Sequence, residues 1–167
     1  MKPSEIAAAA AARLCLDCGM CCNGVLFQIV RLQPGDSVRE LESLGLKLSR
    51  KKSAPYFRQP CEKLIECTCS IYESRPMRCR LFECRQLHRL ENREASEEEI
   101  ARVIESAKSA VENVKTLLLE AGNESLHLPL SERYDQVMAF ESAHENLREA
   151  MEGLQQILNA DFRMEPL

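Results

Sequence analysis

The sequence contains no tryptophan and few other aromatic residues, with five Phe and three Tyr in 167 residues. Aromatic side chains are frequent stacking partners of nucleic-acid bases, so this scarcity argues against a nucleic-acid-binding protein. No stretch approaches the roughly 20 consecutive apolar residues that a membrane-spanning helix requires, and we expect no membrane contact. The chain also lacks a glycine-rich nucleotide loop, a Ser/His/Asp set and a paired-carboxylate arrangement. The sequence therefore offers no recognisable catalytic constellation apart from a metal site, and whether the protein is an enzyme stays open.

Cysteine, in contrast, is abundant, and all nine cysteines lie in the first half of the chain. Two residues between paired cysteines fold a turn whose ends point the same way, so overlapping CxxC units can direct several thiolates toward one ion. An odd number of thiols cannot pair completely as disulfides, which favours a reduced, cytoplasmic protein. The string CLDCGMCC holds Cys15, Cys18, Cys21 and Cys22, and the remaining five are Cys61, Cys67, Cys69, Cys79 and Cys84.

These spacings allow one or two metal sites, occupied by zinc or iron, which includes an iron-sulfur cluster. Cys15, Cys18 and Cys21 form a three-sulfur run similar to that of ferredoxins, and Cys61 is one candidate for a remote fourth ligand. Cys22 should project away from its neighbour, so it would serve a different metal, bridge two metals or stay free. Further ligands for a second four-sulfur site are available in Cys69, Cys79 and Cys84.

The two halves of the chain also differ in charge. Residues 1–90 carry 15 Lys and Arg against 9 Asp and Glu, whereas residues 91–167 carry 7 against 17. A metal site held by four thiolates has a net charge of about −2, which surrounding arginines would compensate. We prefer this explanation of the basic half to nucleic-acid binding, and we interpret the acidic second half as an ordinary solvated surface.

In the first half, the sequence predicts short elements around irregular segments. A helix starts near Pro3 and ends at the cysteine loop, and residues 25–32 suit a short strand. A turn and cap at residues 34–36 precede a short helix that stops at Gly45, and residues 49–60 suit an irregular loop. A helix over about residues 76–90 would place Cys79 and Cys84 about 140° apart around its axis. Those two sulfurs could then face one metal only if the helix bends or begins later.

The last third predicts an antiparallel helical hairpin. Ser96 and Glu99 form a capping-box signature before an apolar repeat that ends at Gly122. Ser131 opens a second helix, whose apolar seam includes Phe140 and His144. We therefore predict a mainly α protein, with a small irregular cysteine-rich metal-binding core and few or no short strands over residues 1–92. The hairpin, over residues 93–167, packs on or beside this core and could bind an unknown protein partner.

The cysteine pattern resembles a known family. CLDCGMCC, followed by C-x7-CSIYESRPMRCRLFEC, is similar to the CxxCxxCC, or YkgJ-like, cysteine-cluster family, whose members are described as zinc- or iron-chelating proteins. The match covers roughly residues 15–84 and implies that eight cysteines are metal ligands, whereas Cys67 has no counterpart in the pattern. The implied ligands are Cys15, Cys18, Cys21, Cys22, Cys61, Cys69, Cys79 and Cys84.

Three functions are consistent with these residues. The preferred one is an iron-sulfur protein with a redox or accessory role, and the second is a zinc-stabilised interaction module. The same cysteine pattern occurs in bacterial flagellin lysine methylases, so the resemblance also admits a component of a protein-modification enzyme. The chain lacks the CxxxCxxC spacing expected of a radical enzyme that uses S-adenosylmethionine. His88, four residues after Cys84, is a further candidate, as a ligand, as an outer donor or as a solvated helix position.

Overall fold

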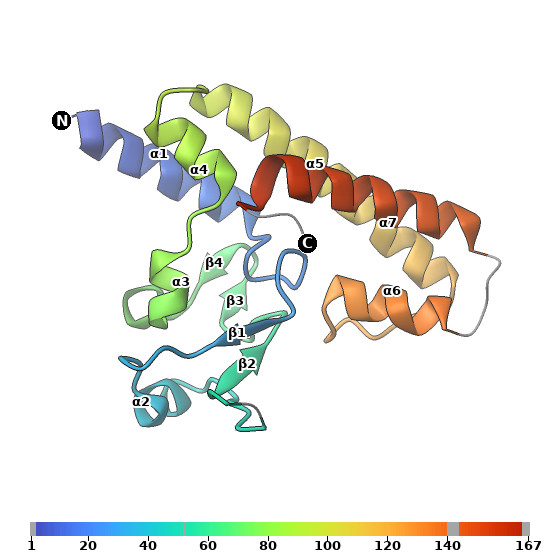
Figure 1. Cartoon of the computed structure of the whole chain (residues 1–167), viewed down its shortest axis with the longest axis horizontal. Coiled ribbons are helices and arrows are strands. Elements are labelled where there is room, and N and C mark those ends of the chain that lie inside the picture. The colour runs from blue at the N-terminus through green and yellow to red at the C-terminus, as the bar shows by residue number, and fades with distance from the viewer. Residues whose placement is uncertain (1–2, 52, 140–143, 165–167) are drawn as a thin grey trace. The chain divides into compact units, whose positions relative to one another are not determined.

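Helices dominate the protein, which we describe from a computed structural model covering residues 3–51, 53–139 and 144–164 (Figure 1). The few strands form two short antiparallel pairs, so the predicted mainly α fold is confirmed. Among the described residues, no helix combines the length and apolar character needed to cross a membrane. The helices are α1 Pro3–Cys18, α2 Val38–Ser43, α3 Met77–Leu81, α4 Arg85–Glu91, α5 Glu97–Glu120, α6 Leu130–Met138 and α7 Glu145–Ile157. The strands are β1 Ile29–Arg31, β2 Tyr56–Arg58, β3 Leu64–Ile65 and β4 Thr68–Cys69, with short turns η1 Tyr72–Ser74 and η2 Leu158–Phe162.

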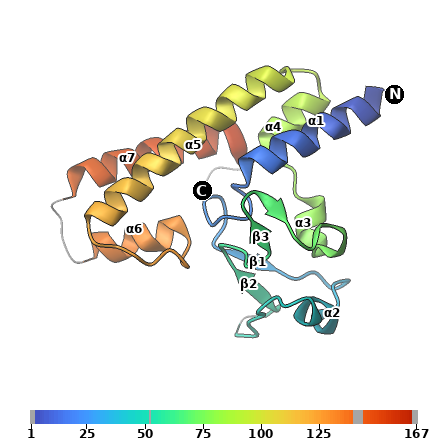
Figure 2. The ribbon, with the colours of Figure 1, turned by 180° about the vertical axis from the view of Figure 1, so that it is seen from behind.

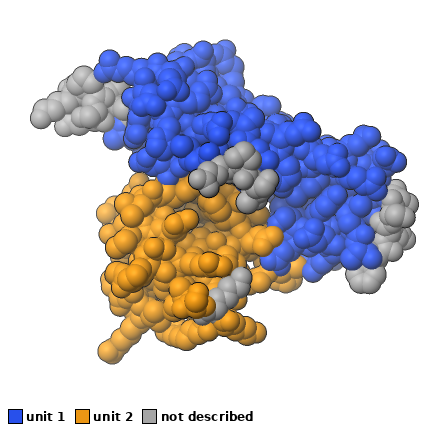
Figure 3. All heavy atoms as spheres, viewed as in Figure 1, with its two compact units in different colours: residues 1–18, 83–126, 130–167 blue, residues 19–82, 127–129 orange. Residues whose placement is uncertain are grey.

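The chain divides into two compact units, which Figure 3 distinguishes by colour. Unit 1 comprises residues 1–18, 83–126 and 130–167, and unit 2 comprises residues 19–82 and 127–129. Unit 1 contains the helices α1 and α4 to α7, and unit 2 contains α2, α3 and all four strands. Three cysteines thus belong to unit 1 and six to unit 2.

The long helices α5 and α7 lie side by side and run in opposite directions, as two opposite views show (Figures 1 and 2). The predicted capping box at the start of α5 is present, with Glu99 N–H donating to Ser96 Oγ and Ser96 N–H donating to Glu99 Oε2. Gly122 has a φ of +78°, a conformation that suits the end of a helix. The buried residues of the two helices are Ile100, Ile104, Ala107, Val111, Val114 and Leu118 of α5 with Leu147, Met151 and Leu154 of α7.

The second helix of the predicted hairpin is divided into α6 and α7. The prediction of a single apolar seam from Ser131 onward was therefore wrong. His144 is the N-cap residue of α7, with a non-helical backbone (φ −93°, ψ 62°), rather than a position within a helix. Phe140 lies outside the described residues. The apolar spacing continues across the break, which is why periodicity alone did not reveal it.

Helix α1 packs against α4 and α5 within unit 1. Arg13 donates two hydrogen bonds to the carboxylate of Glu97, of 2.8 and 2.7 Å, in the paired geometry that suits a guanidinium and a carboxylate. The helix continues to Cys18, so Cys15 and Cys18 lie on its last turn. The helix thus ends at the cysteine loop, directly before Gly19, as predicted, and its last turn contains the first CxxC.

A small apolar core holds unit 2 together. Strands β1 and β2 pair antiparallel, with Val30 opposite Phe57. The strand is shorter than the predicted residues 25–32, and the segment 49–60, which we expected to be irregular, contains β2. Strand β2 was missed because its segment is rich in prolines and basic residues. Only two of its residues, Tyr56 and Phe57, are buried, which is too few to give an alternating pattern. The core consists of Val30, Leu32, Leu41, Leu46 and Phe57.

The cap of α2 also differs from the prediction. Ser37, rather than residues 34–36, caps this helix, and its Oγ accepts a 3.3 Å hydrogen bond from Glu40 N–H. Gly45, at φ +83°, follows the helix, as predicted. Asp36 instead accepts hydrogen bonds from Gln33 N–H and Met77 N–H, both 2.7 Å long. Asp36 therefore joins this turn to the first residue of α3.

The helix that we predicted over residues 76–90 is interrupted. Helix α3 ends at Leu81, Phe82 and Cys84 have extended backbones, and α4 begins at Arg85. The Phe82 ring packs edge-on against Phe27, with centroids 4.9 Å apart. This break removes the basis of the predicted 140° separation between Cys79 and Cys84, because the two residues do not share a helix axis.

Candidate metal centre

A tight turn at residues 19–24 presents the Cys21–Cys22 pair. Gly19 has a φ of +62°, and its carbonyl accepts hydrogen bonds from Cys22 N–H (3.0 Å) and Asn23 N–H (3.1 Å). A Cβ atom at Gly19 would lie 3.2 Å from Cys67 Sγ, so a larger residue here would meet both backbone strain and crowding. Glycine thus allows the chain to reverse directly before the two adjacent cysteines.

The Cys21 and Cys22 sulfurs lie 3.6 Å apart and share a hydrogen bond. Our expectation that the two side chains project apart was therefore wrong. In a tetrahedral thiolate site with a metal–sulfur distance of about 2.3 Å, two sulfurs are separated by about 3.8 Å. The pair thus already has nearly the spacing that one shared ion requires.

The segment that carries Cys61 holds this pair through its backbone. Cys61 N–H donates a 2.8 Å hydrogen bond to the Cys22 carbonyl. The side-chain amide of Gln59 donates to the preceding carbonyl, that of Cys21, at 3.4 Å. Two consecutive carbonyls of the turn are therefore bound by residues 59–61, and this bonding places Cys61 beside the pair.

Helix α3 brings Cys79, and Asp36 fixes the start of that helix. Pro76, the N-cap residue of α3, makes no side-chain capping bond, and the Asp36 carboxylate accepts the Met77 N–H instead. Cys79 and Cys61 both pack against the apolar core of unit 2. Burial there raises the pKa of the Cys61 thiol and raises the pKa of Cys79 to about 12, since a thiolate is poorly solvated among apolar groups.

The vicinal pair has opposite pKa shifts. The hydrogen bond from the Cys22 thiol lowers the pKa of Cys21 to about 7, against the opposing effect of burial. The same hydrogen bond raises the pKa of Cys22, and burial raises it further. Cys21 thus ionises more readily than Cys22, Cys61 or Cys79. Five thiols influence one another electrostatically in unit 2, namely Cys21, Cys22, Cys61, Cys69 and Cys79.

Arg75 supplies positive charge beside these thiols. Its guanidinium lowers the pKa of Cys21 and partly offsets the rise in the pKa of Cys79. The side chain is held by stacking 3.6 Å above the Tyr72 ring and by a 2.9 Å hydrogen bond from its Nε to the Tyr72 carbonyl. Arg75 is therefore held beside these thiols, where the sequence predicted that arginines would compensate the charge of a metal site.

The donor set of unit 2 fits a metal that prefers thiolates, because soft sulfur ligands suit zinc and iron. Among the described thiols, however, no three sulfurs all lie within 4.8 Å of one another. The Cys21–Cys22 pair has nearly the final spacing, whereas the other thiols are near but less tightly gathered. An ion that took more ligands than the Cys21–Cys22 pair would therefore have to draw further thiols toward it.

Comparison with known proteins gives the same chemistry. A family model matches residues 14–115, well over half of the chain, and its description is "CxxCxxCC: Putative zinc- or iron-chelating domain". The protein belongs to the CxxCxxCC family. No curated protein and no solved structure matches the chain. The metal-chelating description of the family thus agrees with the thiol cluster.

Three of the cysteines implied by the CxxCxxCC pattern belong to unit 1. Cys15 and Cys18 are on the last turn of α1, where a spacing of three residues places them on one helix face, and Cys15 is exposed. Cys84 is the N-cap residue of α4. The three-sulfur run that we expected from Cys15, Cys18 and Cys21 is therefore divided between a helix and a turn.

Cys67, which has no counterpart in the CxxCxxCC pattern, lies in the two-residue connection between β3 and β4. The preceding residue, Glu66, has a φ of +56°, which this tight hairpin requires. The Cys67 side chain packs beside Gly19. This packing accounts for Cys67 at this position without requiring that its thiol bind a metal.

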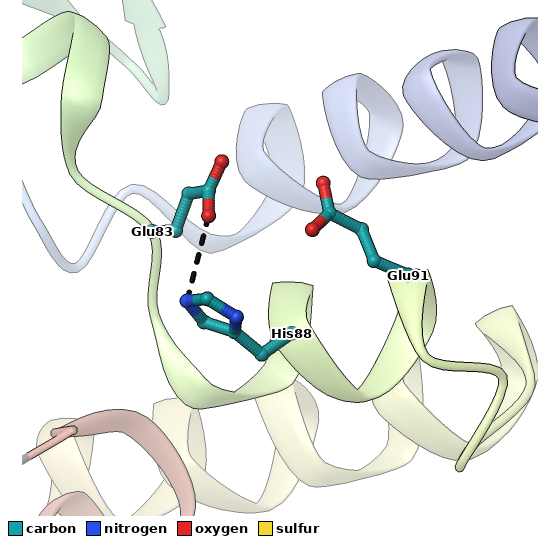
Figure 4. Close-up of side chains that lie close together, drawn as sticks. All are labelled: Glu83, His88 and Glu91. Carbon is teal, nitrogen blue, oxygen red and sulfur yellow. Dashed lines mark ion pairs between the residues drawn. The ribbon is translucent and has the colours of Figure 1, made fainter.

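His88 faces carboxylates. Its Nε2 lies 3.4 Å from Glu83 Oε2, and Glu91 completes a trio whose ligand atoms all lie within 4.8 Å of one another (Figure 4). The His88 and Glu83 side chains are 40% and 46% exposed, and exposed groups of this kind commonly occur without an ion. The Glu83 carboxylate thus gives the His88 side chain a partner without any metal ion.

Sequence reasoning missed two residues that organise the centre. Asp36 fixes α3, and Gln59 binds the Cys21 carbonyl. The position of Gln59, two residues before Cys61 in a cysteine-rich segment, was a weak signal of its burial beside these cysteines. Nothing in the local sequence connects Asp36 with Met77, which lies 41 residues later.

Proposed function

We propose that unit 2 binds one zinc or iron ion through four thiolates, those of Cys21, Cys22, Cys61 and Cys79. The observation that carries this proposal is the 3.6 Å separation of the Cys21 and Cys22 sulfurs, which matches two corners of a tetrahedral thiolate site. The electrostatic coupling of Cys22 with Cys61 and Cys79 supports these two as the remaining corners. Cys69, which influences both Cys61 and Cys79, is the next nearest candidate.

The ion would join three segments that are distant in sequence: the 19–24 turn, the segment after β2 and helix α3. Because the cysteines gather loosely, much of the binding free energy would appear as ordering of unit 2. Arg75 would compensate part of the negative charge that four thiolates place on one ion. The function supported best is therefore metal chelation that also stabilises the fold.

Metal analysis of protein purified without oxygen tests this proposal. We expect about one zinc or iron per chain from four thiolate ligands. Replacing any one of the four cysteines by serine should lower the metal content, whereas Cys67→Ser, an equally half-buried thiol, should leave it unchanged. Wild-type metal content in all four ligand variants would refute the proposed ligand set.

An iron-sulfur cluster is the second candidate, and the number of thiols favours it. Nine cysteines exceed the needs of one ion, and four ligands implied by the CxxCxxCC pattern remain: Cys15, Cys18, Cys69 and Cys84. In this case the protein would be brown, would contain acid-labile sulfide, and would lose its colour in air. Serine at Cys15 or Cys18 would then lower the iron content, an effect that the four-thiolate site does not predict.

A further inference from the structure

Unit 2 and unit 1 each contain one fully buried glutamine, and the two differ in how their amides are bonded. Gln59 and Gln86 are both 1% exposed. The Gln86 amide donates to the Asp161 carbonyl at 2.7 Å, and its oxygen accepts a hydrogen bond from Arg89 at 3.1 Å. The Gln59 amide donates to the Cys21 carbonyl, but its oxygen has no hydrogen-bond partner among the described residues.

This difference bears on what each glutamine contributes to stability. A buried polar atom without a partner costs free energy, whereas a satisfied one contributes modestly. Gln86 has both ends satisfied, one of them by a charged guanidinium, so we expect it to stabilise unit 1. Gln59 combines one long hydrogen bond with one unpaired acceptor, so its amide should add little to the stability of unit 2.

The place of the Gln59 amide explains its presence better than stability does. Its donor nitrogen binds the Cys21 carbonyl, while Cys61 N–H binds the carbonyl of Cys22. Together these bonds hold the carbonyl groups of two consecutive peptide units, the one between Cys21 and Cys22 and the one that follows Cys22, while the Gly19 carbonyl accepts both of their N–H groups. The rotation of these peptide units decides whether the two side chains point together or apart. In the structure the two sulfurs lie 3.6 Å apart.

We propose that Gln59 is a positioning residue of the metal site, whose side-chain amide holds the Cys21 carbonyl so that adjacent cysteines present both sulfurs to one ion. This inference rests on the proposed function, in which Cys21 and Cys22 bind the same metal. Gln59 acts through the backbone of its neighbours and is not itself a ligand. Residues outside the ligand set that orient the ligands typically change metal affinity by about 10- to 100-fold.

The test compares Gln59→Met with Gln86→Met, because methionine keeps the length of the side chain and removes the amide. Each full-length protein is titrated with Co²⁺ without oxygen, and a chelator competes for the metal to give the affinity. Thiolate-to-cobalt absorption reports how many sulfurs bind. We expect Gln59→Met to bind Co²⁺ about 10- to 100-fold more weakly, with reduced thiolate absorption and an unchanged melting temperature of the metal-free protein. Gln86→Met should lower that melting temperature and leave the cobalt spectrum intact.

A second substitution tests the loss of the donor without a change of side-chain shape, and the melting temperature of the metal-free variant identifies any folding defect. Gln59→Glu keeps the shape of the side chain but replaces the donor nitrogen by an acceptor that faces the Cys21 carbonyl, so it should also weaken and alter cobalt binding. Wild-type affinity and spectrum in both Gln59 variants would overturn the positioning role while leaving the proposed function intact. Wild-type protein without any thiolate absorption would overturn both.

Discussion

Removing the carboxylate of Asp36 should loosen α3 and thereby weaken metal binding. The Asp36 carboxylate accepts two backbone hydrogen bonds of 2.7 Å, from Gln33 N–H and from Met77 N–H. Cys79 lies only two residues beyond Met77, on a helix of five residues that has no cap of its own. The order of Cys79, a proposed ligand, therefore depends on a side chain from a distant turn.

The expected loss of folding free energy follows from these two hydrogen bonds. Loss of a helix cap typically costs about 0.5–2 kcal/mol, and hydrogen bonds to charged groups contribute about 1.5–3 kcal/mol. Because Asp36 is only half-buried, water would replace part of the lost bonding, and we expect Asp36→Ala to cost about 2 kcal/mol. Asparagine, whose single amide oxygen can satisfy one of the two donors, should lose about half of this free energy.

Urea unfolding and cobalt competition together provide the assay. If ordering of α3 and metal binding are one process, a loss of about 2 kcal/mol lowers the apparent affinity by about 30-fold. Ser37→Ala, which removes the cap of the neighbouring helix α2, is the matched control, because α2 carries no cysteine. Equal metal affinities in Asp36→Ala and Ser37→Ala would refute the reasoning.

Three other outcomes are expected. Arg75→Gln should raise the pKa of Cys21 above about 7, because it removes a positive charge that stabilises the thiolate; the pH profile of iodoacetamide alkylation measures this, and an unshifted midpoint counts against it. Metal-free protein should lose stability as the pH rises above 9 toward 12, because burial raises the pKa of Cys79 from 9.0 to about 12. The unfolded chain then binds fewer protons than the folded one, so the free energy of unfolding falls with rising pH; urea midpoints in this range check the sign, and Cys79→Ser should flatten the fall. Complete chelation should speed hydrogen exchange at residues 19–82 while the amides of α5 stay protected, because metal-site free energy orders unit 2. Unchanged exchange in both regions would mean that the metal has no part in folding.

Local patterns predicted the helical half of the protein well. The capping box at Ser96 and the stop at Gly122 depend on residues within a few positions of each other, and both are present. The break between α6 and α7 was not predictable in this way, because the apolar spacing runs on across it.

The cysteine half was less predictable, because long-range bonds set its geometry. Cys21 and Cys22 were expected to diverge, as adjacent side chains usually do, and the bonds from residues 59–61 to their carbonyls bring the sulfurs together. Likewise, the sequence indicated a helix through Cys79 and Cys84, and the extended backbone at Phe82, packed on Phe27, interrupts it. The cysteines could be identified as candidate ligands from the sequence, but which of them lie together in the structure could not be predicted.

Most of unit 2 is inserted in the sequence between two parts of unit 1, and this arrangement should raise metal affinity. Residues 19–82 form a loop of 64 residues inserted between α1 and α4, two helices that pack together within unit 1. Once those helices are paired, the loop is closed at its ends, as it would be by a disulfide. Closing a loop of this length removes chain entropy worth about 4 kcal/mol from the unfolded segment. Pairing of α1 with α4 would thus hold the ends of the cysteine segment together before a metal binds. Residues 19–82 prepared as a separate peptide would have to obtain that free energy from metal binding alone.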